Sequence, residues 1–328
     1  MSVSAIHPAQ VLLGAQSGAV ALPVCDHYSG VEDRMRKSLA LQAEMAAEFG
    51  RCVFDVTLDC EDGAAVGAET AHAKLVVNLL KNAEPGARVA ARIHAVDHAS
   101  FADDIAIIAG EAGDKLCHIM LPKVESVEDV VKAENLLQRA TEVPVPLHVL
   151  IESPQAVHRA FEIAAHPRVQ SISFGLMDFV SAHGGAIPAS AMGVQGQFTH
   201  PLVVRAKLEI AAACHAYGKV PAHCVVTEFK NPQAMQQAAQ KAGSEFGYTR
   251  MWSIHPAQIR PILQAFAPSE EEVTQAARIV TAAVAAQWAP ISDDGVLHDR
   301  ASYRYFWQVL ERAAQTGCVL PSTVREWL

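Results

Sequence analysis

The sequence lacks the local motifs of several common cofactor and metal sites. Its seven cysteines show no CxxC spacing, and its 15 histidines show no HExxH pattern, which argues against a zinc site and a disulfide framework. No GxGxxG motif follows the first predicted strand, which disfavours a dinucleotide-binding open sheet.

Long apolar runs and an excess of basic charge are also absent. The formal net charge of −9 gives no sign of a nucleic-acid or anionic-membrane partner. No apolar run reaches the roughly 18 residues that cross a bilayer, and no Lys or Arg precedes the apolar part of the N-terminus. Most cysteines lie among apolar residues, as in a reducing compartment. We therefore expect a cytoplasmic protein.

What the sequence does contain is a regular alternation of apolar strands and amphipathic helices. Eight strand–helix units within about 250 residues are typical of a (β/α)8 TIM barrel. We therefore predict this α/β fold. We expect an N-terminal arm over 1–20, the barrel over 21–267 and an extension over 268–328. The predicted strands are 21–25, 52–58, 88–93, 116–121, 147–151, 169–175, 220–226 and 250–254.

Two carboxylates follow consecutive strands in the segment 146–185. Glu152 ends the strand 147–151, and Asp178 follows the strand 169–175. Parallel neighbours have their carboxyl ends at one edge of the sheet, so the two side chains should lie together there. Such a pair suits Mg²⁺, which takes one or two carboxylates and leaves other positions to water and substrate. A helix N-cap or an ion pair is the structural alternative for each residue.

The second predicted strand ends in three acids within four residues, Asp59, Glu61 and Asp62. A solvated turn would explain them, but they would also share the edge with Glu152. Arg92 lies near the end of the third strand and is costly to bury without a partner. It should therefore pair with these acids or clamp a ligand.

After the barrel, the extension is predicted to form a helix over 269–286, a hairpin turn at Asp294-Gly295 and a helix over 300–315. Its many apolar and aromatic side chains must pack against something. A lid or an oligomer contact is the expected role.

Six short motifs carry a resemblance to a known family. Together, and in this order, they resemble the citrate lyase beta-subunit-like family of the HpcH/HpaI aldolase group, which includes malyl-CoA lyases; the likeness runs from about Leu22 to Arg300. The motifs are LDCEDGAA at 58–65, ARI at 91–93, IMLPKVESVEDV at 119–130, LIESPQAV at 150–157, FGLMDFVSAHG at 174–184 and WSIHPAQI at 252–259.

The resemblance implies a TIM barrel with Mg²⁺ held by Glu152 and Asp178, a substrate-clamping Arg92 and an acidic cluster that includes Glu61. It implies carbon–carbon cleavage or condensation of a 3-hydroxyacyl thioester, typically on coenzyme A, with a 2-oxo acid such as glyoxylate or oxaloacetate as the other fragment. Arg92 would serve the developing oxyanion or the substrate carboxylate.

The family also implies roles outside the metal site. The stretch DGVLHD resembles a motif whose aspartate moves a proton in a neighbouring subunit, which places that role on Asp299, although an N-cap of the last long helix explains Asp299 equally well. Arg34 and Lys37 match positions that face coenzyme A phosphates, with solvated helix charges as the alternative. A homotrimer or hexamer is expected.

The sequence departs from the family at three strands. Leu22-Pro23-Val24-Cys25 replaces an arginine–serine opening, His94 replaces an asparagine, and His223 replaces an aspartate. His94 and His223 motivate one rival, a non-catalytic or regulatory ligand-binding relative. An acyl-CoA thioester hydrolase that uses the same metal site is a further alternative.

Overall fold

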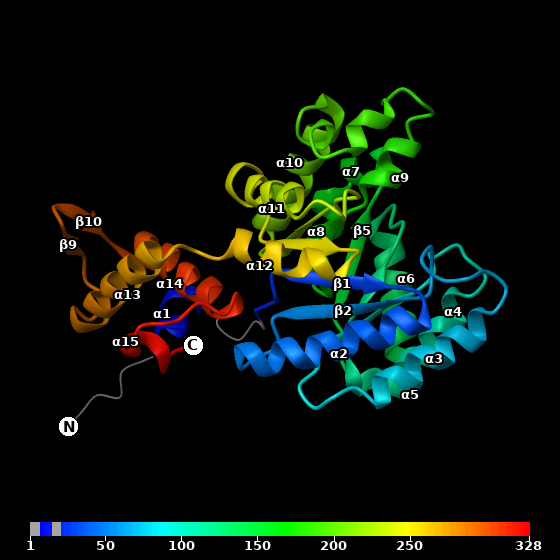
Figure 1. Cartoon of the computed structure of the whole chain (residues 1–328), viewed down its shortest axis with the longest axis horizontal. Coiled ribbons are helices and arrows are strands. Elements are labelled where there is room, and N and C mark those ends of the chain that lie inside the picture. The colour runs from blue at the N-terminus through cyan, green and yellow to red at the C-terminus, as the bar shows by residue number, and fades with distance from the viewer. Residues whose placement is uncertain (1–6, 15–20) are drawn as a thin grey trace. The chain divides into compact units, whose positions relative to one another are not determined.

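The computed structural model describes residues 7–14 and 21–328. Eight parallel strands form a closed barrel in sequence order, and β1 pairs with β8 to close it, which confirms the predicted TIM barrel (Figure 1). The strands are β1 (Cys25–Ser29), β2 (Phe54–Asp59), β3 (Val89–Arg92), β4 (Leu116–Leu121), β5 (Leu147–Ile151), β6 (Val169–Phe174), β7 (Val220–His223) and β8 (Arg250–Ser253).

Helices follow the barrel strands and cover the outside of the sheet (Figure 1). A π-helical segment, Ile105–Ala109, joins α4 to α5. Short 3-10 helices lie at 113–115, 189–192, 196–198 and 256–258. The helices of the barrel are α2 (Glu32–Phe49), α3 (Glu69–Lys81), α4 (Phe101–Asp104), α5 (Gly110–Ala112), α6 (Val127–Ala140), α7 (Pro154–His158), α8 (Ala160–Ala165), α9 (Leu176–Ser181), α10 (Pro201–Ala216), α11 (Pro232–Phe246) and α12 (Ile259–Phe266).

The chain divides into two compact units. One unit is Val24–Ala265, which holds the barrel. The other combines the N-terminal Met1–Pro23 with the C-terminal Phe266–Leu328. Most of the predicted N-terminal arm, residues 1–6 and 15–20, lies outside the described residues; α1 (Pro8–Leu13) is its described helix.

One predicted strand is misplaced for an identifiable reason. The first strand begins at Cys25 rather than ending there, because the polar Asp26 is accommodated inside the barrel, where it accepts a hydrogen bond of 2.7 Å from Thr57. The helix α11 continues to Phe246, and Gly247 ends it in the left-handed conformation with φ 73°.

Close contacts shape the carboxyl edge of the barrel. A Cβ atom at Gly175 would come within 2.5 Å of the Cβ atom of Glu152, so only glycine lets β6 end beside this side chain. The turn after β5 is fixed by Ser153, which caps α7 by accepting from Ala156 N at 3.0 Å. Pro154 occupies the first helical position, where its missing N–H is harmless.

The second unit has its own apolar core. The helices α13 (Glu270–Ala285), α14 (Arg300–Gln315) and α15 (Ser322–Arg325) pack with α1, and β9 (Ile291–Asp293) pairs with β10 (Val296–His298) in the predicted hairpin. Tyr303 and Trp307 are buried in this core. Leu297 and Tyr305 remain 74% and 58% exposed. The extension therefore buries part of its aromatic surface within itself.

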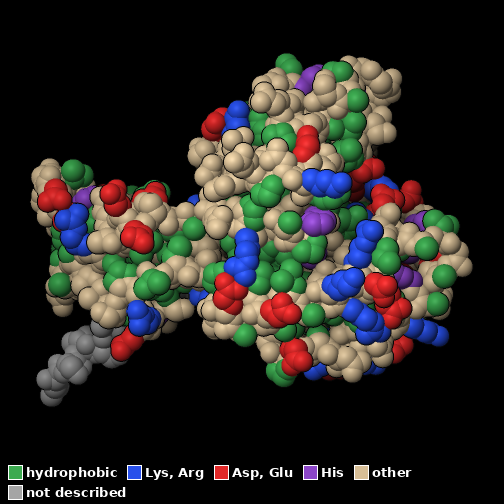
Figure 2. Space-filling model, in the orientation of Figure 1, with side chains coloured by type: hydrophobic (Ala, Val, Ile, Leu, Met, Phe, Trp, Pro, Cys, Tyr) green, Lys and Arg blue, Asp and Glu red, His purple; other side chains and the backbone are tan. Residues whose placement is uncertain are grey.

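In the part of the chain that the structure describes, none of the helices is both long and apolar enough to cross a membrane. Acidic and basic side chains are interspersed over the face of the barrel unit drawn in Figure 2.

Candidate active site at the carboxyl edge of the barrel

The structure brings Glu152 and Asp178 to the same edge of the barrel. Glu152 directly follows β5, and Asp178 lies in the first turn of α9, three residues after Gly175. The backbones of the two segments are joined at this point, because Gly175 N donates to Ile151 O at 2.9 Å. The strand-end pairing predicted from the sequence is thus present, with Asp178 on a helix rather than on a strand.

The electrostatics of this pair fit a cation. Glu152 is buried, and burial followed by the charge of Asp178 raises the pKa of the Glu152 carboxyl to about 8. One of its oxygens accepts a hydrogen bond of 2.7 Å from Lys123 N. The two carboxylates carry like charges that repel each other, and both offer oxygen as the ligand atom. A hard divalent ion such as Mg²⁺ would stabilise such a pair.

Arg92 lies at the end of β3, inside the same edge. Its Nε and Nη2 atoms donate to the two oxygens of Asp59, each at 2.6 Å, in a bidentate pair. Its Nη1 atom lies 3.2 Å from Glu61 Oε2. The guanidinium also stacks over the rings of Tyr28 and Trp252, at 4.8 and 5.9 Å. The sequence predicted that Arg92 pairs with the second-strand acids or clamps a ligand, and the structure shows its pairing with Asp59 and Glu61.

The charges around Arg92 keep it ionised. Burial by itself would lower the pKa of the guanidinium, but the hydrogen bonds and charge of Asp59, together with Glu61, outweigh burial and raise it. Asp59 in turn accepts from the backbone N–H groups of Glu61 and Gly63 at 3.0 and 2.7 Å. Asp59 therefore fixes both the loop after β2 and the orientation of Arg92.

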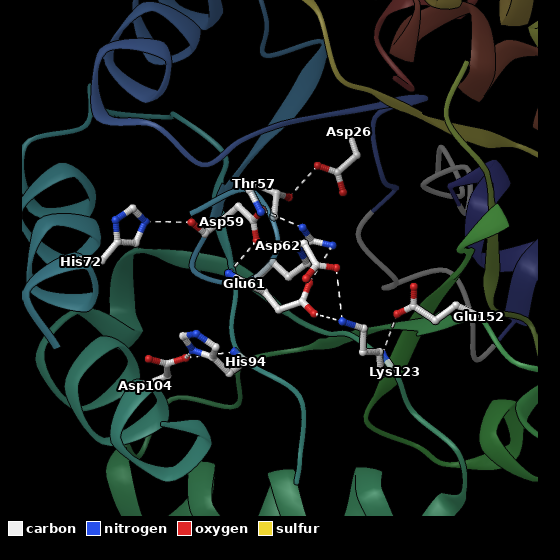
Figure 3. A network of polar contacts seen from close by, with 12 residues as sticks. Asp26, Thr57, Asp59, Glu61, Asp62, His72, His94, Asp104, Lys123 and Glu152 are labelled. Carbon is white, nitrogen blue, oxygen red and sulfur yellow. Dashed lines mark hydrogen bonds and ion pairs between the residues drawn. The ribbon is translucent and has the colours of Figure 1, made fainter. Parts of the chain in front are cut away.

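Lys123 connects the acidic cluster to Glu152, as Figure 3 shows. Its ammonium donates to Glu61 and, at 3.2 Å, to Asp62, while its backbone N–H holds Glu152. The sequence analysis quoted Lys123 within a motif but gave it no role. Its left-handed backbone, with φ 51°, aims the N–H at Glu152, and no local pattern in the sequence signals that conformation.

Comparison with known proteins assigns the family. The family model described as HpcH/HpaI aldolase/citrate lyase matches residues 38–256, which span the acidic cluster, Arg92 and the Glu152/Asp178 pair. The chain belongs to the HpcH/HpaI aldolase/citrate lyase family.

Relatives of this family resemble the chain along most of its length. The L-malyl-CoA/beta-methylmalyl-CoA lyase of Cereibacter sphaeroides is 28% identical over 267 residues, covering 76% of this chain and 81% of that protein. A crystal structure of a citrate lyase from Burkholderia xenovorans LB400 is 49% identical, covers 99% of both chains and has a TM-score of 0.80. The protein CitE from Mycobacterium tuberculosis, solved with magnesium and acetoacetate, is 25% identical, covers 76% of this chain and 92% of its own, and has a TM-score of 0.60.

The two histidines that depart from the family pattern have structural partners. His94 Nδ1 lies 2.6 Å from Asp104 Oδ2, and its backbone N donates to the same oxygen at 2.9 Å. His223 is buried, its ring stacks on Phe198 with centroids 5.3 Å apart, and burial lowers its pKa well below the usual value. Figure 3 shows His94 with its partner Asp104 in the same view as Lys123 and Glu152.

Three further predicted residues lie on α2 and at the start of α14. Arg34 and Lys37 are exposed on α2. Asp299 caps α14: its Oδ1 accepts from Ala301 N at 3.0 Å and Ser302 N at 3.4 Å. The capping alternative for Asp299 is therefore realised in the structure, while its proton-transfer role and the coenzyme A contacts of Arg34 and Lys37 stay predictions.

A second polar cluster occupies the amino ends of the strands. Asp26, His118 and His148 bring potential metal-ligand atoms within 4.8 Å of one another. However, Arg250 Nη2 lies 2.9 Å from Asp26 and 2.6 Å from Asp55, so the acids already have a cation. The His118 and His148 rings stack at 3.5 Å with planes 13° apart, so the lone pairs of the two rings lie in separate, nearly parallel planes. We therefore regard this cluster as a structural layer.

Proposed function

We propose that the chain is a magnesium-dependent carbon–carbon lyase that cleaves or forms a 3-hydroxyacyl thioester, carried on coenzyme A, with a 2-oxo acid such as glyoxylate or oxaloacetate as the other fragment. The single observation that carries the proposal is the mutually repelling pair of carboxylates, Glu152 and Asp178, at the same barrel edge as Arg92. The lyase activity of the malyl-CoA relatives supports the thioester.

In this proposal each side chain has a defined task. Glu152 and Asp178 would hold Mg²⁺, which when bound supplies a Lewis acid for the carbonyl of the 2-oxo acid. Arg92, fixed by Asp59 and packed against Tyr28 and Trp252, would place its remaining N–H groups against the oxyanion of the thioester enolate. Because Asp59 already fixes the guanidinium, little reorganisation is needed as that charge develops.

A panel of acyl-CoA substrates, assayed with and without magnesium, tests this function. Release of a 2-oxo acid together with a shortened acyl thioester supports the lyase. Release of free thiol without a 2-oxo acid would favour a hydrolase, an activity named for the (3S)-malyl-CoA thioesterase of Cereibacter sphaeroides, 28% identical over 229 residues. No turnover in any combination would favour a regulatory relative.

The proton transfer is proposed to involve Asp299 from a neighbouring subunit in a homotrimer or hexamer. The exposed Leu297 and Tyr305 near Asp299 support a contact with another chain. Mixing Glu152→Gln and Asp299→Asn proteins under subunit exchange should restore partial activity, because some sites would combine intact Glu152 with intact Asp299. No recovery despite exchange, or a monomer by light scattering, would leave Asp299 as a helix cap.

A further inference from the structure

Glu61 lies between two cations at the carboxyl edge. Its Oε1 atom accepts from Lys123 Nζ, and its Oε2 atom lies 3.2 Å from Arg92 Nη1. The side chain is only 7% exposed. Within the described residues, Oε2 accepts no hydrogen bond, so this buried oxygen interacts with Arg92 by charge alone. A buried acceptor without a hydrogen bond is costly to keep.

The position of Glu61 blocks part of Arg92. A guanidinium has five N–H donors, and Asp59 uses one on Nε and one on Nη2. The remaining donors are on Nη1 and Nη2, and Glu61 lies against Nη1. The anionic group of a ligand that pairs with this end of Arg92 would meet the negative charge of Glu61 at the same place.

Lys123 offers Glu61 a second partner. Its backbone is anchored by the hydrogen bond from Lys123 N to Glu152, so the origin of the side chain is fixed. Its side chain is 38% exposed, and its ammonium also contacts Asp62, whose side chain is 59% exposed. The ammonium therefore lies on the solvent side of Glu61 and can keep the carboxylate paired when Arg92 releases it.

We propose that Glu61 is an internal competitor of the substrate: it occupies the place of the ligand's anionic group on Arg92, and ligand entry displaces it from Arg92 and leaves it paired with Lys123 alone. The identity of the ligand as a 2-oxo acid rests on the proposed function. The exchange itself rests on the contacts among Glu61, Arg92 and Lys123. This exchange makes Glu61 a specificity-determining residue. Anions that bind Arg92 only weakly cannot displace Glu61 and are therefore disfavoured.

Three variants test the exchange by calorimetric titration of pyruvate at saturating magnesium. Glu61→Gln removes the competing charge and should tighten binding about tenfold, the size of effect expected for a partly buried charge. Lys123→Met removes the second partner and should weaken binding several-fold. Asp62→Asn, the matched control, removes an equal charge from the exposed side of Lys123 and should change the affinity less than about twofold.

The same series titrated with acetate in the absence of magnesium separates this inference from the proposed function. If no variant binds pyruvate but Glu61→Gln binds acetate more tightly than Asp62→Asn does, the 2-oxo acid function fails and the exchange stands. Weaker ligand binding by Glu61→Gln would overturn the exchange, because Glu61 would then be a ligand contact. Equal affinities in Glu61→Gln and Asp62→Asn would also overturn it, because the effect would be one of net charge.

Discussion

The two ends of the barrel interior both bury charged side chains, but only one end balances them. At the amino ends of the strands, Asp26 and Asp55 face Arg88 and Arg250, two acids against two bases. At the carboxyl ends, Lys123 and Arg92 face a larger number of acids. These are Asp59, Glu61, Asp62, Glu152 and Asp178.

The difference separates a structural cluster from a functional one. Burying a balanced cluster needs no outside partner, because each charge is compensated by a neighbour. An unbalanced cluster of acids carries excess negative charge, which a bound divalent cation can compensate. Residue types alone do not make this distinction: the amino end has histidines and acids whose ligand atoms lie within 4.8 Å of one another, yet we propose that the carboxyl end holds the metal.

The largest effect is expected from breaking the balance at the amino end. Asp55→Asn removes the carboxylate that pairs with both Arg250 at 2.6 Å and Arg88 at 2.5 Å. Removing one partner of a buried ion pair typically costs about 3–5 kcal/mol, and we expect a loss of that size in the free energy of unfolding. Urea denaturation measures it. A loss below about 1 kcal/mol would mean that the pairing is not needed for stability.

Arg92→Lys tests the carboxyl end. Lysine keeps the charge but loses the planar fork that Asp59 orients, so kcat/KM should fall about 100-fold. Magnesium affinity should stay near the wild-type value, because Arg92 is not a ligand. Steady-state kinetics and calorimetry give the two numbers. Near wild-type activity would reduce Arg92 to an ion-pair partner of Asp59.

The pH dependence of stability distinguishes the two ends as well. Burial lowers the pKa values of His27 to about 4 and of His148 to about 3, and lowers those of His118 and His223 well below normal. These histidines stay neutral in the folded chain while the unfolded chain takes up protons below about pH 6.5. Their stabilising contribution is therefore present above pH 6.5 and is lost toward pH 4, by up to about 1.4 kcal/mol per pH unit for each histidine.

Glu152 should oppose this trend in the metal-free protein. Its folded pKa of about 8 lies above its ordinary value, so its contribution is present at low pH and is lost as the pH rises toward 8. In Glu152→Gln this opposing slope disappears. Urea denaturation between pH 5.5 and pH 7.5 should thus show a steeper loss on acidification in the variant than in the wild type. Parallel curves would contradict the raised pKa of Glu152.

The smallest expected effect is the stability of Glu152→Gln itself at neutral pH. The substitution removes a carboxyl whose ionisation is opposed by burial and by Asp178. The free energy of unfolding without magnesium should be unchanged or higher, in contrast to the loss expected for Asp55→Asn. These two carboxyl-to-amide changes are a matched pair, and a large destabilisation by Glu152→Gln would remove the contrast between the two ends.

The sequence predicted those parts of the molecule that depend on local periodicity. The bounds of β4 and β5 agree with the predicted 116–121 and 147–151, and the meeting of Glu152 with Asp178 follows from parallel strands. The balanced cluster could not be predicted, because Asp55 and Arg250 are 195 residues apart and read locally as polar interruptions of strands. The predicted bounds of β1 were wrong for the same reason: Asp26 is typical of the start of a loop, and its partners in the barrel are distant in sequence.

The role of Lys123 was missed for a different reason. Its ammonium meets Glu61 from 62 residues away, and its N–H reaches Glu152 only because the backbone is left-handed. Neither feature has a signature in residue spacing. Long-range pairing and local backbone conformation are therefore what the sequence left undetermined at this site.

The central claim is that the unbalanced carboxyl edge binds the metal and the balanced amino end does not. Its most direct test is calorimetric titration of Mg²⁺ into the wild type, Glu152→Gln, Asp178→Asn and His148→Asn. Circular dichroism checks that each protein is folded. We predict that the wild type and His148→Asn bind one Mg²⁺ ion with similar affinity, and that Glu152→Gln and Asp178→Asn show no measurable binding. Wild-type affinity in both carboxylate variants, or loss of binding in a folded His148→Asn, would contradict the account.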